Sequence, residues 1–320
     1  MKISRGLTAY ARQPSPVLTI GNFDGQHVGH RALLQMVVHR AEEIGGTPMV
    51  LTFDPHPIMV LAPQVALQFL TSKEEKLARF EEAEIAEVIM LEFTPALAAL
   101  SPDQFVWDIL VAGIGVKELF VGEHFRFGKG RAGRITDLTR FGAAFGFTVH
   151  PVAPVPVDGA VVSSTSIRKL IQAGDVREAA RGLGRGYTLS GTVVHGAQRG
   201  QSMGWPTANL RLPAGRLIPP DGVYATKTVW RGAAYDSVSY IGTRPTFGAG
   251  ERLLEVSLLD TEVDLYGQEI AVTFIERVRG DEVFQSADEL AIRIRSDVER
   301  AREALRTWTM PLQGVGGRLA

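Results

Sequence analysis

The chain has 320 residues, which is long enough for two domains with separate hydrophobic cores. Hydrophobic residues make up 45% and charged residues 22%, the composition of a soluble globular protein. A formal net charge of −1 excludes a global basic field for nucleic acid, and the lack of cysteine excludes disulfides and thiolate metal sites. No apolar run reaches the length of a membrane span and none follows the N-terminus as a leader would, so we expect a cytoplasmic protein.

An apolar, β-branched run at 17–20 is followed by a glycine-rich loop and then by the helical run 31–38. This order predicts a strand, a tight loop and a helix. The glycines let the backbone approach a ligand, and the helix start offers unpaired N–H groups to an anion. His27 and His30 are three residues apart, so we expect both on one face of the first helical turn. Together with Asp24 they favour phosphate-group transfer over a purely structural turn.

The run 48–53 predicts a second buried strand, which ends in Asp54-Pro55-His56-Pro57. Ligands bind at the carboxyl ends of the strands in an open parallel sheet. Two prolines with an aspartate and a histidine also make an ordinary loop, so spacing alone leaves a site at 54–57 open.

Strands continue to alternate with helices through the first half. Further strands are predicted at 87–93 and 118–121, and capping patterns begin helices at Ser72 and Ser101. The alternation predicts a parallel sheet with helices on both faces.

Two later segments of the first half have the composition of anion-binding sites. The strand at 118–121 is followed by glycines and basic residues such as Arg126, which suit a polyphosphate or a flavin phosphate but also a solvated loop. Hydroxyl side chains at 163–166 precede Arg168, which predicts a helix start that either binds an anion or is only N-capped.

Glycines at 182, 184 and 186 place a domain boundary near Arg185. Beyond it the helical periodicity gives way to short alternating strands, which predict a small antiparallel barrel. These strands are expected at 187–194, 223–230, 234–241, 253–259 and 270–278. A capping box at Ser286–Glu289 then begins a helix with one apolar stripe, which is expected to pack against the barrel; the stripe consists of Leu290, Ile294, Val298, Ala301 and Leu305.

Two features of the second half could bind or activate a substrate. Thr207 and Asn209 would face the same way in a strand, and their oxygens are hard ligands suited to Mg²⁺, although such pairs are common. Glu255 lies in a largely apolar strand and could be a charge at the edge of the core or a general base.

These segments resemble the bacterial bifunctional riboflavin kinase/FAD synthetases. The loop at 21–30 is similar to their GNFDGxHxGHxxLL form of the HxGH adenylyltransferase signature, and 54–57 to their DPHP segment. The segment 162–168 resembles the (I/V)SSTxIR motif, and 204–209 the G(F/W)PTAN motif of riboflavin kinases. Further matches are found at 222–224, 241–247, 254–256 and 264–267.

The resemblance implies an α/β plus β architecture. An N-terminal Rossmann-like HxGH nucleotidyltransferase domain would span 1–184, a small antiparallel β-barrel riboflavin kinase domain with a C-terminal helix 185–310, and a mobile tail 311–320. The barrel would phosphorylate riboflavin to FMN, and the α/β domain would adenylylate FMN to FAD and pyrophosphate. The implied cofactor is Mg²⁺ with ATP, and the partners are ATP, riboflavin and FMN, with no nucleic acid and no membrane. Homo-oligomer formation is left open.

The resemblance also implies roles for individual residues. The catalytic residues would be Glu255, which activates the ribityl 5′-hydroxyl, and His27, His30 and Arg168, which stabilise charge in adenylyl transfer. The nucleotide of that step would bind Gly21, Phe23, Asp24, Gly29, Ser164 and Thr165, and the flavin or its phosphate Asp54, His124 and Arg126. In the kinase, Gly196, Arg199, Gly204 and Pro206 would bind ATP or flavin, and Thr207 and Asn209 the metal.

Some positions depart from the family pattern. His124 stands where Asn or Asp is usual, Ser257 where His is frequent and Thr261 where Phe is frequent, and 278–282 is a looser form of an LRDE-like segment. The departures in the barrel suggest one alternative, a single-activity FMN adenylyltransferase whose barrel only binds flavin. A second alternative, a nucleic-acid-binding protein with an OB-like barrel, is disfavoured by the near-neutral charge.

Overall fold

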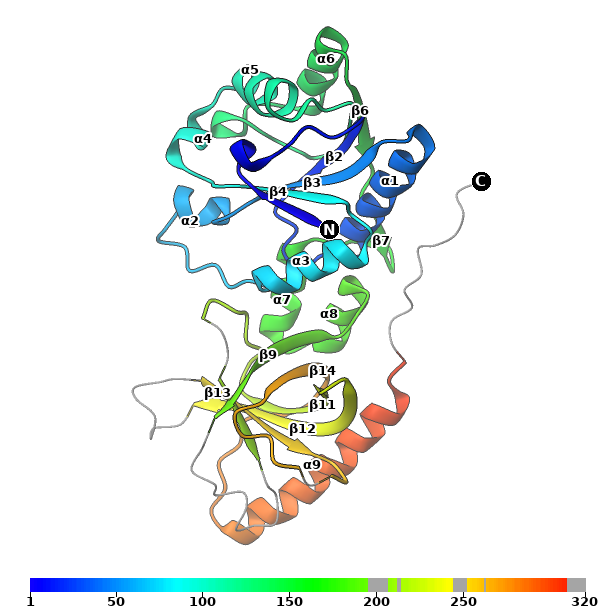
Figure 1. Ribbon diagram of the computed structural model, residues 1–320. Coiled ribbons are helices and arrows are strands. Elements are labelled where there is room, and N and C mark those ends of the chain that lie inside the picture. Colours follow the sequence, from blue (N-terminus) through cyan, green and yellow to red (C-terminus); the bar gives the residue numbers. More distant parts are fainter. Residues whose placement is uncertain (195–206, 212–213, 244–251, 262, 310–320) are drawn as a thin grey trace. The chain divides into compact units, whose positions relative to one another are not determined.

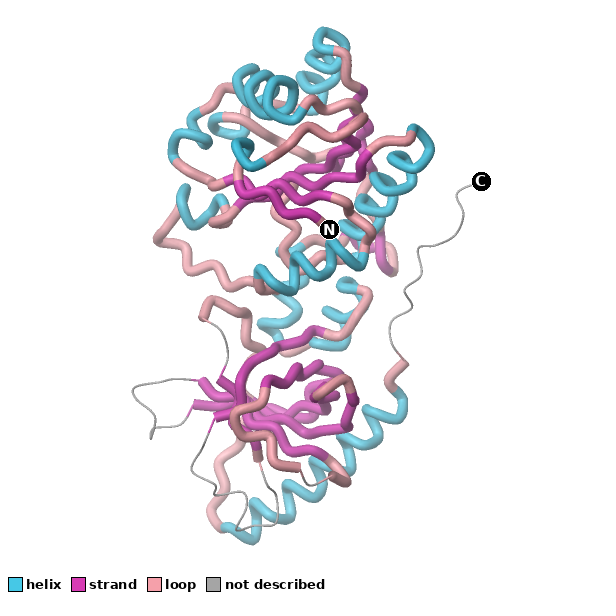
Figure 2. Tube along the Cα trace, viewed as in Figure 1, coloured by secondary structure: helices cyan, strands magenta, loops and turns pink. Residues whose placement is uncertain are grey.

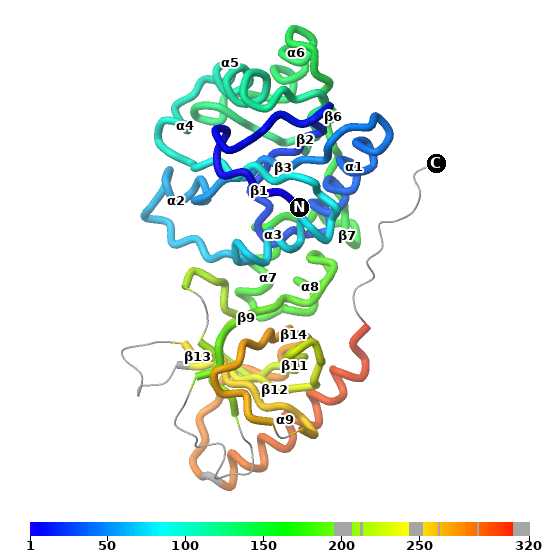
Figure 3. The backbone as a smooth tube through the Cα atoms, viewed as in Figure 1, coloured from blue at the N-terminus to red at the C-terminus, as the bar shows by residue number. Residues whose placement is uncertain are grey.

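The computed structural model describes residues 1–194, 207–211, 214–243, 252–261 and 263–309. The chain forms two compact units, Met1–Val162 and Ser163–Ala320, whose courses can be followed by colour in Figure 3. The predicted tail at 311–320 lies outside the described residues. No helix in the described ranges combines the length and the apolar character that a membrane span requires.

The first unit contains a six-stranded parallel sheet in the order β1-β4-β3-β2-β5-β6 (Figure 1). Its strands are β1 (Lys2–Arg5), β2 (Pro16–Ile20), β3 (Thr47–Phe53), β4 (Glu87–Leu91), β5 (Glu118–Gly122) and β6 (Thr148–Val152). The four strands predicted by apolar runs are confirmed. The edge strands β1 and β6 lack such a run because only one side chain of β1 and none of β6 is fully buried.

Helices cover both faces of the sheet, as predicted (Figure 2). The first face packs on α1 (Val28–Ile44) and α3 (Lys73–Glu82) around Phe23, Leu34 and Phe80. The second packs on η2 (Phe105–Ile114), which directly follows the short α5 (Pro102–Gln104), and on α6 (Ile135–Phe145). The smaller elements are η1 (Leu7–Ala9), α2 (Pro57–Leu61), α4 (Pro95–Ala99), η3 (Lys129–Arg131) and the hairpin β7 (Pro156–Val157) and β8 (Ala160–Val161).

Capping explains where several of these helices begin and end. The capping boxes at Ser72 and Ser101 are both formed reciprocally, as predicted. Helix α1 ends at Gly45, which has a φ of 61°, a conformation that costs glycine little. The segment η2 is a π-helix rather than the ordinary helix that its apolar run suggests.

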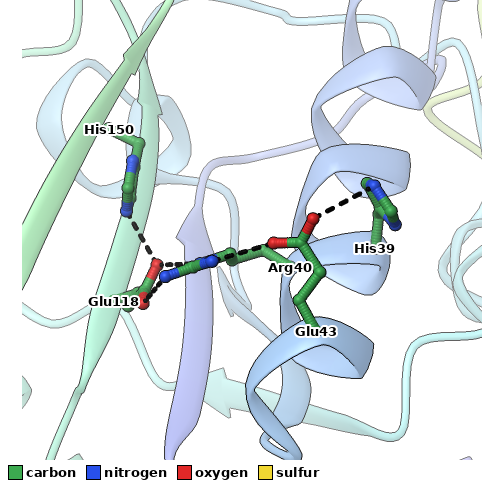
Figure 4. A network of polar contacts seen from close by, with 5 residues as sticks. All are labelled: His39, Arg40, Glu43, Glu118 and His150. Carbon is green, nitrogen blue, oxygen red and sulfur yellow. Dashed lines mark hydrogen bonds and ion pairs between the residues drawn. The ribbon is translucent and has the colours of Figure 1, made fainter. Parts of the chain in front are cut away.

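A polar network ties α1 to the first residue of β5, Glu118, and to the middle residue of β6, His150 (Figure 4). The guanidinium of Arg40 donates to both carboxylate oxygens of Glu118 at 2.8 Å, and Nε2 of His150 lies 2.8 Å from one of them. Arg40 also pairs with Glu43, which His39 contacts at 3.3 Å. The hydrogen bond from Arg40 is the main reason that the pKa of Glu118 is lowered.

The second unit contains a closed antiparallel barrel in the order β10-β13-β12-β11-β14-β9, as predicted (Figure 1). Its strands are β9 (Tyr187–Val194), β10 (Ala208–Arg211), β11 (Gly222–Trp230), β12 (Ala233–Thr243), β13 (Arg252–Leu258) and β14 (Glu269–Gly280). Four fully buried hydroxyls form hydrogen bonds inside it at 2.8 Å; they belong to Thr226, Thr228, Ser237 and Ser239.

Helix α9 (Ala287–Thr307) packs on the outside of the barrel against β11, β12 and β14. Four of the five predicted stripe residues are confirmed in this contact, whereas Leu290 lies half-buried outside that core cluster. The hydroxyl of Ser286 accepts the N–H of Glu289, but the Glu289 carboxylate accepts the N–H of Gln285. The predicted capping box at Ser286 is therefore wrong in its second half.

Two helices precede the barrel in the second unit, α7 (Ser164–Ala173) and α8 (Val176–Leu183). Gly174 ends α7 with a φ of 88°, and α8 packs against β9 and β14. Asp175 stands at the N-cap of α8 without a capping hydrogen bond from its side chain. The functional domain boundary near Arg185 stays a prediction.

Candidate active sites

The strand order of the sheet reverses between β2 and β5, and open α/β sheets bind ligands at such a point. The loop after β2 begins at Gly21, and the exposed side chains of His124 and Arg126 follow β5. Asp54 follows β3 and forms an ion pair with Lys73. These loops, which were identified from sequence motifs, therefore all lie at the carboxyl edge of the sheet.

His27 and His30 are in contact, but not in the way that their spacing predicts. Helix α1 begins at Val28, and His27 is its N-cap in an extended conformation, so the expectation of two side chains on one helical face is wrong. Nδ1 of His27 accepts the N–H of His30 at 3.3 Å, and the two rings stack with centroids 3.7 Å apart. Stacking brings the two imidazoles to the helix start together.

The hydrogen bond identifies the acceptor nitrogen of His27, and burial affects the pKa of His30. Because Nδ1 of His27 accepts a hydrogen bond, it is Nε2 of this ring that carries a proton. Burial, and then the neighbouring His27, hold the pKa of His30 well below its usual value. Nδ1 of His30 is buried and has no hydrogen-bond partner in the described ranges. Near neutral pH His30 is therefore a neutral imidazole, and it stacks on the ring of His27 at a helix N-terminus.

The neighbouring positions fix the rings. Phe23 is 1% exposed, has a φ of 52° and contacts His30 edge-on at 5.1 Å. A Cβ at Gly29 would lie 3.2 Å from the ring of His27, and one at Gly21 would lie 3.1 Å from the ring of Phe23. A side chain at either position would therefore press on an aromatic ring of the site, a reason for glycine that the motif itself does not reveal.

Asp24 holds the loop through buried hydrogen bonds. Its carboxylate, 5% exposed, accepts the backbone N–H groups of Leu70 and Thr71 at 3.0 to 3.1 Å and the hydroxyl of Thr71 at 3.1 Å. The Thr71 hydroxyl in turn accepts the N–H of Gly25 at 3.1 Å. Sequence reasoning missed Thr71 because its partner is 47 residues away and neither residue has a local signature for the pair.

The hydroxyl-rich segment before Arg168 begins helix α7, as predicted. Ser163 is the N-cap, and its hydroxyl accepts the N–H of Ser166 at 3.1 Å. Ser164, Thr165 and Arg168 follow in the first turns of this helix, within the second unit. Their placement beside the two imidazoles stays a prediction.

The barrel places two of the predicted kinase residues next to each other. Asn209 of β10 pairs directly with Glu255 of β13, and the two side chains are 4% and 7% exposed. Oδ1 of Asn209 is buried and accepts no hydrogen bond from the residues that the structure describes. Thr207, half-buried, directly precedes β10 rather than lying in it. A buried amide oxygen lacking a donor beside a carboxylate fits a hard cation.

Tyr240 was not found by sequence reasoning. It pairs with Glu255 across β12 and β13, and its hydroxyl donates to Asp281 at 2.9 Å. Burial, helped by this bond and by nearby carboxylates, raises the pKa of Tyr240 to about 12. The phenol is therefore neutral beside Glu255. The predicted kinase residues Gly196, Arg199, Gly204 and Pro206 lie outside the described residues.

Comparison with known proteins assigns both halves of the chain. A family model for FAD synthetase matches residues 10–166, and one for riboflavin kinase matches 183–305. The bifunctional riboflavin kinase/FMN adenylyltransferase of Escherichia coli (strain K12) is 38% identical over 306 residues, covering 95% of this chain and 97% of the relative. The protein of the same name from Pseudomonas fluorescens is 39% identical over 287 residues, covering 89% and 92%.

A solved structure has the same fold. It is described as a macrolide-efflux protein from Streptococcus pneumoniae and matches with a TM-score of 0.87 at 28% identity. The match covers 97% of this chain and 100% of the solved one. The architecture of both units therefore recurs in a crystal structure.

Proposed function

Because the chain belongs to the family of bifunctional riboflavin kinase/FMN adenylyltransferases, we propose that its two reactions are divided between the two sites described above. The protein phosphorylates riboflavin to FMN with ATP and adenylylates FMN with a second ATP to give FAD. We assign the first reaction to the Asn209–Glu255 site of the barrel and the second to the loop at 21–30. The observation that supports this division is the pair of stacked imidazoles at the start of α1.

In the adenylyl step, an oxygen of the FMN phosphate attacks the α-phosphorus of ATP, and the bond to the leaving pyrophosphate breaks. The attacking phosphate is already an anion, so no strong base is needed. His27 and His30 would donate N–H groups to the oxygens on which negative charge builds, and Arg168 would neutralise charge on the leaving group.

The remaining residues of the first site would bind the two substrates. Gly21, Phe23 and Gly29 shape the loop so that N–H groups at the start of α1 can bind the nucleotide phosphates. Asp24 would act through the loop that it holds, and Ser164 and Thr165 through the first turn of α7. On the flavin side we place three residues from the carboxyl edge of the sheet, namely Asp54, His124 and Arg126.

In the kinase step, Glu255 would accept the proton of the ribityl 5′-hydroxyl while this oxygen attacks the γ-phosphorus of ATP and ADP leaves. Thr207 and Asn209 would hold Mg²⁺, and the unpartnered Oδ1 of Asn209 supports this fit. The ion, when bound, neutralises charge on the transferring phosphate. From the resemblance we add Gly196, Arg199, Gly204 and Pro206 as nucleotide or flavin contacts. Both steps consume ATP, and we place them in the cytoplasm.

A time course with riboflavin, ATP and Mg²⁺, followed by chromatography of the flavins, tests the proposal. FMN should appear before FAD, and each FAD should be accompanied by one ADP and one pyrophosphate. FAD formation from added FMN without any ADP release from riboflavin would instead identify a single-activity adenylyltransferase. Asn209→Ala should raise the Mg²⁺ concentration needed for FMN formation and leave that for FAD formation unchanged.

A further inference from the structure

Residue 76 of helix α3 contacts the loop at 21–27 from two sides. Its backbone carbonyl accepts a hydrogen bond from Nε2 of Gln26 at 2.8 Å. Its side-chain ammonium lies 3.5 Å from the carbonyl oxygen of Asn22 and 3.4 Å from the hydroxyl of Thr52, at the end of β3. Gln26 and Thr52 are 1% and 0% exposed. Lys76 therefore connects α3, the end of β3 and both halves of the loop.

The ammonium is held in a partly buried place by long contacts. Lys76 forms no ion pair within 4 Å in the described part of the chain. Two carboxylates, those of Asp54 and Asp24, raise its pKa from a distance, but each is bonded to other groups. Burial lowers the pKa of Lys76; these carboxylates partly oppose that shift, and Lys73 adds to it. Partial burial of an ammonium whose contacts are a carbonyl and a hydroxyl costs folding free energy, which suggests that its charge has a role in the site.

The contact with Asn22 determines how the next peptide is turned. In a trans peptide the C=O and the following N–H point in opposite directions. With the Asn22 carbonyl directed at Lys76, the N–H of Phe23 points away from α3, and it makes no hydrogen bond to any residue that the structure describes. It is therefore available to an oxygen of a bound phosphate, together with the N–H groups at the start of α1.

We propose that Lys76 is a positioning residue for FMN adenylylation, which fixes the orientation of the 22–23 peptide and thereby the N–H donors of the phosphate-binding loop. This inference rests on the assignment of adenylyl transfer to the loop at 21–30. Lys76 acts through the backbone and needs no contact with substrate. Its removal should lower the rate of the chemical step rather than the affinity for flavin.

The test compares Lys76→Met, Lys76→Arg and the exposed control Lys117→Met. Lys76→Met should lower kcat of FAD formation on the order of 10²-fold, the effect of misplacing a reacting group by about 1 Å. Its KM for FMN and its FMN formation from riboflavin should stay at the values of the unchanged protein. Lys117→Met should match the unchanged protein in all three quantities, since this side chain is exposed at the amino end of β5.

The pH profile separates a charge requirement from a packing role. In the unchanged protein, kcat of FAD formation should fall on the alkaline side as Lys76 loses its proton below its usual pKa. In Lys76→Arg this fall should move to higher pH, because a guanidinium stays protonated there. FMN formation should show no such movement. An identical alkaline fall in Lys76→Arg would overturn the proposal, as would unchanged FAD formation in Lys76→Met.

His30→Ala in the same assay distinguishes this inference from the function on which it rests. If His30→Ala loses FAD formation and Lys76→Met retains it, only the role of Lys76 fails. If both variants retain FAD formation, the assignment of adenylyl transfer to this loop fails as well.

Discussion

Replacing Asp24 by alanine removes the acceptor for two buried backbone N–H groups, those of Leu70 and Thr71, and for the Thr71 hydroxyl. An orphaned buried donor costs about 1–3 kcal/mol, so the two backbone groups alone give roughly 2–6 kcal/mol. For a unit of this size, about 2–4 °C of melting temperature is lost per kcal/mol, so the transition of the first unit should fall by roughly 4 °C or more.

Hydrogen exchange and calorimetry together measure this effect. Amide exchange in a peptide that includes Leu70 and Thr71 should accelerate in Asp24→Ala, because these N–H groups lose their acceptor. Asp54→Ala is the matched control: this carboxylate is 44% exposed and ion-paired with a side chain that is 34% exposed, a pair worth about 1 kcal/mol at most. The melting temperature and the amide exchange of Asp54→Ala should stay close to those of the unchanged protein.

The reasoning is refuted if Asp24→Ala melts and exchanges like Asp54→Ala. It is equally refuted if Asp24→Ala only weakens ATP binding, because Asp24 would then contact the nucleotide instead of holding the loop.

Three further changes test other parts of the structure. Arg40 lowers the pKa of Glu118 in the folded protein. The carboxylate of Glu118 therefore stabilises the fold at pH values above its pKa in the unfolded chain, and this stabilisation is lost as the pH falls through its pKa in the folded protein. Chemical denaturation should show that Glu118→Gln is less stable than the unchanged protein at neutral pH and equally stable in acid. Thr228→Val should destabilise the barrel by about 0.5–1.5 kcal/mol in calorimetry, since one hydrogen bond is lost while the buried Ser237 hydroxyl keeps its bonds to Thr226; FAD formation from FMN should persist. Gly29→Ala should lower the rate of FAD formation about tenfold without unfolding the protein. The added Cβ, 3.2 Å from the ring of His27, should displace that ring by less than about 1 Å, and a displacement of roughly 1 Å lowers the rate about 10²-fold.

Most of the fold could be predicted because apolar periodicity reports burial directly. Strands β2 to β5 are buried on both faces and appear as apolar runs. Parts of the barrel strands β9 and β14 alternate between buried and less buried residues. Strand β1, with a single fully buried residue, has no such pattern. The π-helix η2 has an apolar run that fits any helix, so its hydrogen-bond pattern could not be predicted from that run.

The candidate sites were found through motifs, but their geometry was not. The spacing of His27 and His30 predicts proximity, whereas the stacked arrangement arises because His27 is an extended N-cap. The pairing of Asp24 with Thr71, and of Lys76 with Asn22, joins residues 47 and 54 positions apart. Such long-range contacts are determined by how α3 and the segment before it pack against the loop that follows β2, which no local pattern encodes.

The central claim, that each reaction belongs to one of the two sites, is tested most directly by assaying His30→Ala and Glu255→Gln side by side with riboflavin and then with FMN as substrate. We predict that His30→Ala makes FMN at the normal rate and FAD about two orders of magnitude more slowly, the usual effect of one lost transition-state donor. Glu255→Gln should make almost no FMN from riboflavin but normal amounts of FAD from added FMN. Loss of both activities in either folded variant, or full FMN formation by Glu255→Gln, would contradict the division of the two reactions.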